Sequence, residues 1–423
     1  MSANGTSRAQ RLLPTMLVCL AALSNACSSE PLDVPARRAY PIPGCEALEP
    51  AACNVHEKAC VVSRLAIAAC LRETEAENPP PVTIMTEQRY VDFVNALYDG
   101  REVAGTNHFE VAMVWLGMAA PGSFAFVPLQ TKDVANYFGT YRWREKDLLV
   151  IDHGRPADDE ASNVALVGAL IRALRDRDSD IAAWTTVVSV FDVDSNWGAD
   201  GMYFGEGRFY SNRYQASLDG EDPGNFDEFA RINHGIREDV AYIRAQPSPY
   251  VASNERFPHN FGARAMYLAW QRGGVDAVNA LWRSKLLTHQ LMASETVEGK
   301  PPTLKYHGRP RSPEQWDQNA TVTALGAWGL FLSLSRSLQS EAAWSLALNW
   351  SGEQLFVYKG LSPNEAETAC VWQLEMADES AASALEEALR AGDRSARIGR
   401  SGTFVTLAKA SNDDALDWAF VDD

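Results

Sequence analysis

Residues 163–178, with the sequence NVALVGALIRALRDRD, contain the pattern from which we infer the fold of this chain. Its apolar residues recur at intervals of three or four, which is typical of one face of an α-helix: Val164, Val167, Leu170, Ile171 and Leu174. The segment therefore predicts an amphipathic helix that packs its aliphatic side into a protein core. Between these residues stand Gly168, Ala169 and Arg172, none of which can hold a metal ion.

The composition indicates an acidic globular protein. The chain has 423 residues, of which 46% are hydrophobic, so it is long enough to bury a substantial core. Its 38 Lys and Arg residues are outnumbered by 55 Asp and Glu residues, which gives a formal net charge of −17. A surface of this charge repels the phosphates of nucleic acids, so we expect no nucleic acid among the partners.

The N-terminus predicts an export signal. Two arginines precede an apolar run over residues 12–23, and the small residues at 24–26 lie directly before Cys27. Residues 1–26 therefore read as a signal peptide. The segment is similar to a bacterial lipoprotein signal, in which Cys27 becomes the lipidated first residue, although Leu23 lies one position earlier than the usual aliphatic residue.

The same segment sets the expected location of the mature chain. We expect export to a bacterial cell envelope, with a membrane anchor through the lipid on Cys27, facing the periplasm or the outside. Ordinary cleavage before Cys27 is the alternative. After Leu23 no apolar run approaches the roughly 18 to 20 residues of a membrane-spanning helix.

Four cysteines lie close together in the sequence after the signal: Cys45, Cys53, Cys60 and Cys70. They predict a small unit held together by disulfides. In an oxidising compartment they predict two disulfides, with three connectivities open. A zinc site that includes His56 is the alternative, but the gaps between the cysteines are wider than usual for zinc ligands. Cys370 has no local partner, and we expect a buried thiol there.

The chain reads as a helix-rich α+β protein. The proline-rich segment 76–83 predicts a boundary near residue 80. We therefore divide the chain into the signal, a Cys-rich segment with its linker at 27–80, a main domain at 81–349 and a small α+β subdomain at 350–423.

Individual elements follow from periodicity and from glycine and cap signals. Helices are expected at 87–100, at 107–118 with Thr106 as N-cap, at 260–274 and 275–287 with a break at Gly273 and Gly274, at 321–348 as a pair, and at 380–392. Paired strands are expected at 136–143 and 147–154, further strands at 353–358 and 369–376, and a hairpin at 395–410 that turns at Ser401 and Gly402. The glycine-rich region 182–260 predicts irregular structure.

The motif of a zinc peptidase is missing from the helix at 163–178. Such enzymes need two histidines one helical turn apart and a glutamate beside the first, in the pattern HExxH. The seven histidines of this chain include no two that share a helical turn.

Nevertheless, residues 168–181, GALIRALRDRDSDI, resemble without a gap the metal-binding helix of bacterial, often lipoprotein, gluzincin-like metallopeptidases, which reads approximately HELVHALQDQHFDL. Residues 203–210, YFGEGRFY, look like the segment that carries the third metal ligand in that family. The resemblance extends weakly over residues 87–408 and implies a zincin-like scaffold.

This chain departs from the family at the chemistry. Gly168 and Arg172 stand at the two histidine positions and Ala169 at the catalytic glutamate, so Glu206 alone remains of the metal set. The resemblance therefore implies a pseudo-peptidase without catalytic residues and without bound zinc, which uses the former substrate cleft to bind a peptide or protein, or serves structurally. Gly201, Gly205 and Gly207 argue against a regular helix around Glu206.

The resemblance also suggests a candidate cleft, made of Arg172, Asp192, Asp194, Tyr203, Glu206 and Tyr210. In it the guanidinium of Arg172 either pairs with Glu206, in the space of the cation, or lies exposed without a partner.

Two other functions stay open. Asp192, Asp194, Asp200 and Glu206 lie among aromatic residues, and paired carboxylates of this kind are typical of a carbohydrate-active hydrolase. The same loop would also suit a calcium ion or simple solvation. A metalloenzyme with non-standard ligands is the remaining alternative.

Overall fold

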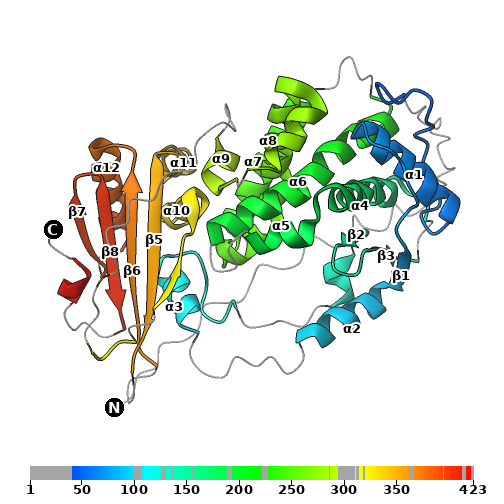
Figure 1. The fold of residues 1–423 in the computed structure, drawn as a ribbon. Coiled ribbons are helices and arrows are strands. Elements are labelled where there is room, and N and C mark those ends of the chain that lie inside the picture. Colours follow the sequence, from blue (N-terminus) through cyan, green and yellow to red (C-terminus); the bar gives the residue numbers. More distant parts are fainter. Residues whose placement is uncertain are drawn as a thin grey trace, which may run out of the picture. The chain divides into compact units, whose positions relative to one another are not determined.

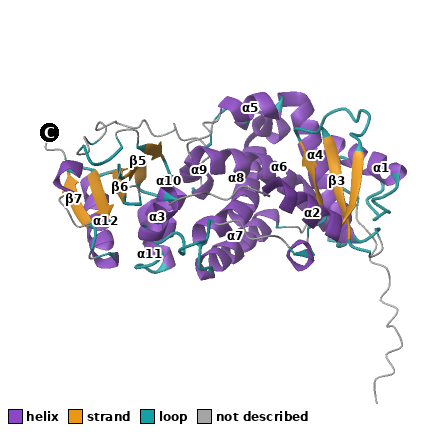
Figure 2. Ribbon diagram, turned by 90° about the horizontal axis from the view of Figure 1, so that it is seen from below, coloured by secondary structure: helices purple, strands orange, loops and turns teal. Residues whose placement is uncertain are grey.

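The structure is a computed structural model, and it describes residues 41–98, 107–124, 130–135, 137–154, 157–187, 193–221, 227–284, 286–293, 310, 314–317, 320–361, 366–393, 395–411 and 416–420. The predicted signal peptide, Cys27, Thr106 and Asp192 lie outside these residues. Residues 39–423 belong to one compact unit. The fold is α+β, with a helical part and two separate sheets, as the sequence predicts (Figure 1, Figure 2).

The helix predicted from residues 163–178 is α4, Glu160–Ser179. It begins after Asp159, whose carboxylate accepts a hydrogen bond from the Ser162 amide at 2.6 Å, and ends at Asp180 in the left-handed conformation (φ 42°). All five residues of the predicted aliphatic face are buried. Burial of that face is therefore what the sequence pattern encodes.

The prediction of irregular structure at 182–260 is wrong. This region holds α5 (Ile181–Val187), α6 (Val193–Leu218), α7 (Glu228–Ala245) and the first part of α8 (Pro249–Leu281). Glu206 lies inside α6, a regular helix of 26 residues, so the doubt that its glycines raised is also wrong.

Close helix packing explains the glycines of α6. A β-carbon on Gly205 would overlap the backbone of Gly262 in α8, and one on Gly201 would meet the side chain of Leu291. On α4, a β-carbon at Gly168 would lie 3.5 Å from the carbonyl oxygen of Gly207. Figure 1 shows α6 between α4 and α8, in agreement with the contacts of α6 with both helices. These glycines let the helix backbones approach each other, which offsets their low helix propensity.

The later helices include the predicted break. Within α8, Gly273 and Gly274 leave the helical conformation, Gly274 with φ 61°. Three short helices follow, α9 (Thr288–Met292), α10 (Gly326–Leu334) and α11 (Ser340–Ala347).

The Cys-rich segment is stapled as predicted. Disulfides join Cys45 to Cys70 and Cys53 to Cys60, so these cysteines are not zinc ligands. Helix α1 (Lys58–Leu71) carries Cys60 and Cys70 and packs against α4. The predicted linker after α1 leads into β1 (Val82–Thr86).

A three-stranded sheet has the order β1–β3–β2. The predicted antiparallel pair is β2 (Gly139–Arg142) and β3 (Asp147–Asp152), while β1 pairs with β3 in parallel. The predicted helix α2 (Glu87–Tyr98) packs against β1 and β3, whereas the predicted helix α3 (His108–Trp115) contacts the strands at Trp350–Lys359 and Thr368–Met376. The N-cap of α3 is Asn107, whose side chain accepts from the Glu110 amide at 3.1 Å, and not Thr106.

Most C-terminal elements match the prediction, but the segment 321–348 is not helical throughout: Thr321–Thr323 form a strand that pairs with the strand at Trp350–Lys359, so the prediction is wrong at these residues. An antiparallel sheet has the order β4–β5–β6–β8–β7, and α12 (Glu379–Gly392) packs against β6, β7 and β8. The strands are β4 (Thr321–Thr323), β5 (Trp350–Lys359), β6 (Thr368–Met376), β7 (Arg397–Ser401) and β8 (Phe404–Ala410). Two short 3₁₀ helices, Thr131–Val134 and Leu416–Ala419, complete the described elements. Cys370 is a buried free thiol, and burial raises its pKa to about 12.

The domain boundaries drawn from the sequence fall near residue 80, just before β1, and at residue 350, where β5 begins. They stay predictions. None of the described helices is both long and apolar enough to cross a bilayer.

Candidate functional site

The positions aligned with the metal set lie on α4 and α6, which pack against each other. Gly168 faces α6 at Gly207 and Ser211. Ala169 is buried and lines a small hollow together with Phe138 and Gly139 near the β2–β3 hairpin. The structure thus brings Gly168 to the same helix that carries Glu206, while Ala169 points to a different neighbour.

Glu206 is enclosed by two arginines. Only 1% of this residue is exposed. Arg175 Nη2 and Nε donate to its Oε1 and Oε2 at 2.6 and 2.8 Å, and Arg72 Nε donates to Oε1 at 3.1 Å. The guanidinium of Arg175 therefore binds both carboxylate oxygens in the bidentate geometry that makes such pairs strong.

Further contacts hold the two arginines in place. Arg72 Nη1 also bonds Asp178 at 3.1 Å, and Arg175 Nη2 bonds Asn279 at 2.8 Å. The Arg175 guanidinium lies 4.9 Å from the ring centroid of Trp282. Arg72 is the C-cap residue of α1 and Arg175 lies in α4, so Glu206 joins the Cys-rich segment and α4 to α6.

The expected ion pair between Arg172 and Glu206 is not formed. Arg172 Nη2 donates instead to Thr140 Oγ1 on β2 at 3.2 Å, and its guanidinium lies 5.6 Å from the ring centroids of both Tyr203 and Phe204. The carboxylate of Glu206 is bound instead by Arg175, which lies about one helical turn later on α4. The alternative of an exposed Arg172 is also wrong, because only 8% of the residue is exposed.

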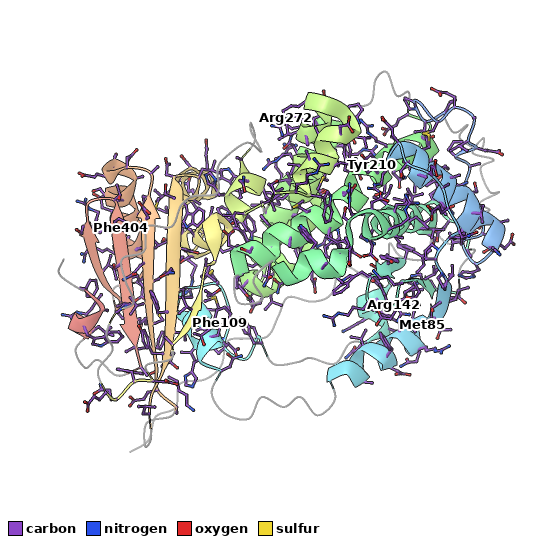
Figure 3. All side chains as sticks on the ribbon, viewed as in Figure 1. Met85, Phe109, Arg142, Tyr210, Arg272 and Phe404 are labelled. Atoms are coloured by element: carbon purple, nitrogen blue, oxygen red, sulfur yellow. A yellow bond between two sulfur atoms is a disulfide. The ribbon has the colours of Figure 1, made fainter. Side chains whose placement is uncertain are left out.

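The other described residues of the candidate cleft, Asp194, Tyr203 and Tyr210, are interior side chains. Asp194 is buried and accepts from the amide and hydroxyl of Thr288 at 2.8 and 2.6 Å. Tyr203 is buried and donates to the Tyr141 carbonyl at 3.1 Å. Tyr210, labelled in Figure 3, is fully buried, and burial next to the negative charge of Glu206 raises its pKa. These residues therefore do not line one open cleft.

Their burial also argues against the carbohydrate-active alternative. Asp194 and Glu206 are each held by donors inside the protein, so neither carboxylate is free to protonate or attack a sugar. Asp200 is exposed, and no pairing with either of them is recorded among the described side chains.

A second buried carboxylate lies near Asp194. Glu353 on β5 accepts from the amides of Leu325 and Gly326 at the start of α10, the latter at 2.5 Å, and from Trp372 Nε1 at 2.5 Å. Burial, and less strongly the charge of Asp194, raise the pKa of Glu353 to about 8. No cation faces this carboxylate among its hydrogen-bond partners in the described part of the chain.

A described cavity lies elsewhere. It has a volume of about 640 Å³ and is lined by residues that include Tyr141, Lys146, Asp176 and Asp180. Asp176 accepts from Tyr141 at 2.7 Å and from Lys146 at 2.6 Å, so its charge is used within the protein. None of the positions aligned with the metal set lines this cavity.

The prediction from sequence did not include Arg175, Arg72 or Glu353. Arg175 could have been found, because it follows Gly168 and Arg172 on one helical face and stands where the related motif has glutamine. Arg72 is 134 residues from Glu206, and no local pattern indicates it. Glu353 reads in the sequence as an ordinary strand residue.

The described residues contain no group of three or more His, Cys, Asp or Glu side chains arranged to hold a metal ion. Comparisons with family models, with curated proteins and with solved structures find no match for this chain.

Proposed function

We propose that this chain is an exported protein of the bacterial cell envelope, built on a degenerate gluzincin-like scaffold, that has lost peptidase chemistry and keeps a binding or structural role. The observation that carries the proposal is the enclosure of Glu206 by Arg175 and Arg72. Three N–H donors occupy the two carboxylate oxygens, and two positive charges at this distance repel Zn²⁺.

The absence of the other ligands supports the same proposal. Gly168 and Ala169 offer no donor atom, and Arg172 has only N–H donors. A zinc peptidase needs three protein ligands and a general base to activate water. A hydrolytic role would therefore need residues other than the aligned ones.

The direct test is metal analysis of the mature chain. Purified protein, incubated with ZnCl₂ and desalted, is expected to hold far less than one zinc per chain and to leave a library of quenched fluorescent peptides uncleaved. Stoichiometric zinc together with cleavage that a chelator abolishes would overturn the proposal.

A second test addresses the scaffold itself. The variant Gly168→His, Ala169→Glu, Arg172→His and Arg175→Gln restores the motif of the related peptidases and frees Glu206 from its bidentate partner. We expect it to gain zinc binding. The matched control adds Glu206→Gln and should lose that zinc again. If the folded variant binds no zinc, or if the control binds as well, the inherited frame is refuted.

The envelope location needs its own test. A lipid on Cys27 predicts that the chain partitions into the membrane fraction of the producing bacterium and that Cys27→Ser moves it to the soluble fraction. Mass spectrometry of the mature N-terminus measures the modification directly. An unmodified Cys27 would favour ordinary secretion.

A further inference from the structure

Arg172 is a buried cation for which the described residues supply no carboxylate. One of its nitrogens donates to Thr140, while Nε is buried without a hydrogen-bond partner. The neighbours on α6 are the neutral rings of Tyr203 and Phe204. Burying a guanidinium without a counter-ion costs free energy, and an anionic group bound to Arg172 would offset that cost.

The guanidiniums of Arg208 and Arg256 also act on the same region, where they face His259 together with Arg172. His259 on α8 packs against Phe204 with ring centroids 5.0 Å apart. Burial, and then the positive charges of Arg172, Arg208 and Arg256, lower the pKa of His259 to about 3. The imidazole is therefore neutral at pH 7 and adds a polar group without a charge.

Among the described residues, one carboxylate forms an ion pair with one of these three arginines. Asp239 on α7 lies 3.7 Å from Arg256 and accepts a hydrogen bond from Asn260 at 2.7 Å. It does not pair with Arg172. The region is thus locally positive in a chain whose formal net charge is −17, which is unusual enough to point to an anionic ligand.

We propose that Arg172, Tyr203, Phe204 and His259 form a binding site for a carboxylate carried on an apolar or aromatic group, such as the C-terminus of a peptide. The inference rests on the proposed binding role of this region and names its ligand class. The free Nε–H and a neighbouring N–H of one planar guanidinium can bind both oxygens of a carboxylate.

The surroundings favour a carboxylate over phosphate. One buried guanidinium between aromatic rings matches one negative charge on an apolar group, whereas a phosphate dianion requires more donors. Phe204 and His259 are half-buried and Arg208 is exposed, so the site can be reached from their side. Because the Nε atom is itself buried, ligand binding requires a neighbouring side chain to move.

The test uses N-acetyl-Ala-Phe with a free C-terminus and the same dipeptide as its C-terminal amide, with inorganic phosphate as a third probe. Calorimetry on the mature wild-type protein is expected to show binding of the free acid and at least tenfold weaker binding of the amide. Arg172→Gln should reduce the affinity for the free acid about tenfold or more, and Arg172→Lys should restore part of it.

Arg390→Gln on α12 is the control for net charge, because Arg390 is exposed and pairs with Glu386. It should leave the affinity unchanged. Equal binding of acid and amide, preference for phosphate, no binding at all, or full binding by Arg172→Gln would each overturn the proposal. Circular dichroism checks that the variants fold, and the wild-type comparison of acid with amide decides the matter even if they do not.

Failure of this inference is distinct from failure of the proposed function. Zinc and peptide cleavage in the wild-type protein would refute the inactive scaffold and leave the carboxylate measurement standing. Lack of carboxylate binding would refute only the site at Arg172.

Discussion

Glu206 and Glu353 are both almost completely buried, at 1% and 3% exposure, yet the protein accommodates them in different ways. Glu206 on α6 faces two guanidiniums. Glu353 on β5 faces backbone amides and an indole N–H, which are dipoles and carry no net charge. Burial accordingly raises the pKa of Glu353 to about 8.

The difference gives the two buried carboxylates different effects on stability. The carboxylate inside the ion-pair network joins the C-terminal end of α1 and helices α4 and α6, and removal of a member of the network leaves buried charge uncompensated. A carboxylate held by dipoles alone can take up a proton as the pH changes. The helical part therefore depends on charge pairing, and the contact of β5 with α10 depends on protonation.

The largest expected effect is that of Glu206→Gln. It leaves the buried Arg175 without a carboxylate and Arg72 with Asp178 alone, so the free energy of unfolding should fall by about 3–5 kcal/mol. Urea denaturation measures the change. The matched control is Glu386→Gln, since Glu386 also bonds two arginines, Arg390 and Arg400, but on the surface of α12. Its cost should stay below about 1 kcal/mol; equal costs would show that the network around Glu206 is not special.

Glu353→Gln should change the pH dependence of stability. The folded-state pKa of about 8 lies above the unfolded value of 4.5, so the native state holds a proton that the unfolded chain releases. Wild-type stability should therefore fall as the pH rises from about 4.5 to 8, by up to about 1.4 kcal/mol per pH unit.

The best window for that measurement is pH 6.5 to 8. His259 has its pKa lowered to about 3 by burial and by neighbouring arginines, so it contributes the opposite slope between about 3 and 6.5. Denaturation of Glu353→Gln at pH 6.5 and 8 should show a smaller slope than the wild type. Glu341→Gln, at an exposed residue of α11, is the control. An unchanged slope in Glu353→Gln means that Glu353 does not titrate in this range.

Gly205→Ala tests the packing of the helices rather than their charges. Its new β-carbon would overlap the backbone of Gly262, so α6 and α8 must move apart, at a cost of about 1–3 kcal/mol. Thermal unfolding measures the loss. A neutral result would mean that the contact between α6 and α8 adjusts freely.

Gly168→Ala should have the smallest effect, and its sign is the informative part. Its β-carbon would sit at ordinary contact distance from the Gly207 carbonyl oxygen, 3.5 Å away. Alanine also favours the helix over glycine by up to about 1 kcal/mol, so stability should stay the same or rise. A clear loss would show that α4 and α6 are packed more tightly than the structure indicates, and it would make a histidine at residue 168 impossible.

Much of the fold could be predicted from the chain. The helix at 163–178, the β2–β3 hairpin, the break at Gly273 and Gly274 and the C-terminal sheet all follow from periodicity and turn residues. The error over α6 has one cause. Glycine at 201, 205 and 207 indicates a loop when only the local chain is considered, whereas here it is the residue that lets α6 touch α4 and α8.

The candidate site could be predicted only in part. The sequence predicts a helix at Gly168 and Arg172 and groups them with Glu206, and these residues lie on α4 and α6, which pack against each other. It does not reveal that Arg175 and Arg72 take the carboxylate while Arg172 turns to Thr140, because that choice depends on side-chain geometry across three helices and a strand.

By itself the sequence determined most of the helices and strands outside residues 182–260, because periodicity is set within a few neighbouring residues. It also determined that Gly168 and Ala169 cannot bind a metal, because their side chains carry no donor atom. Only the tertiary structure decided how the cysteines pair, that glycines belong inside α6, and which charges are buried together. These depend on residues up to 134 positions apart, whose approach is fixed by the packing of the whole core.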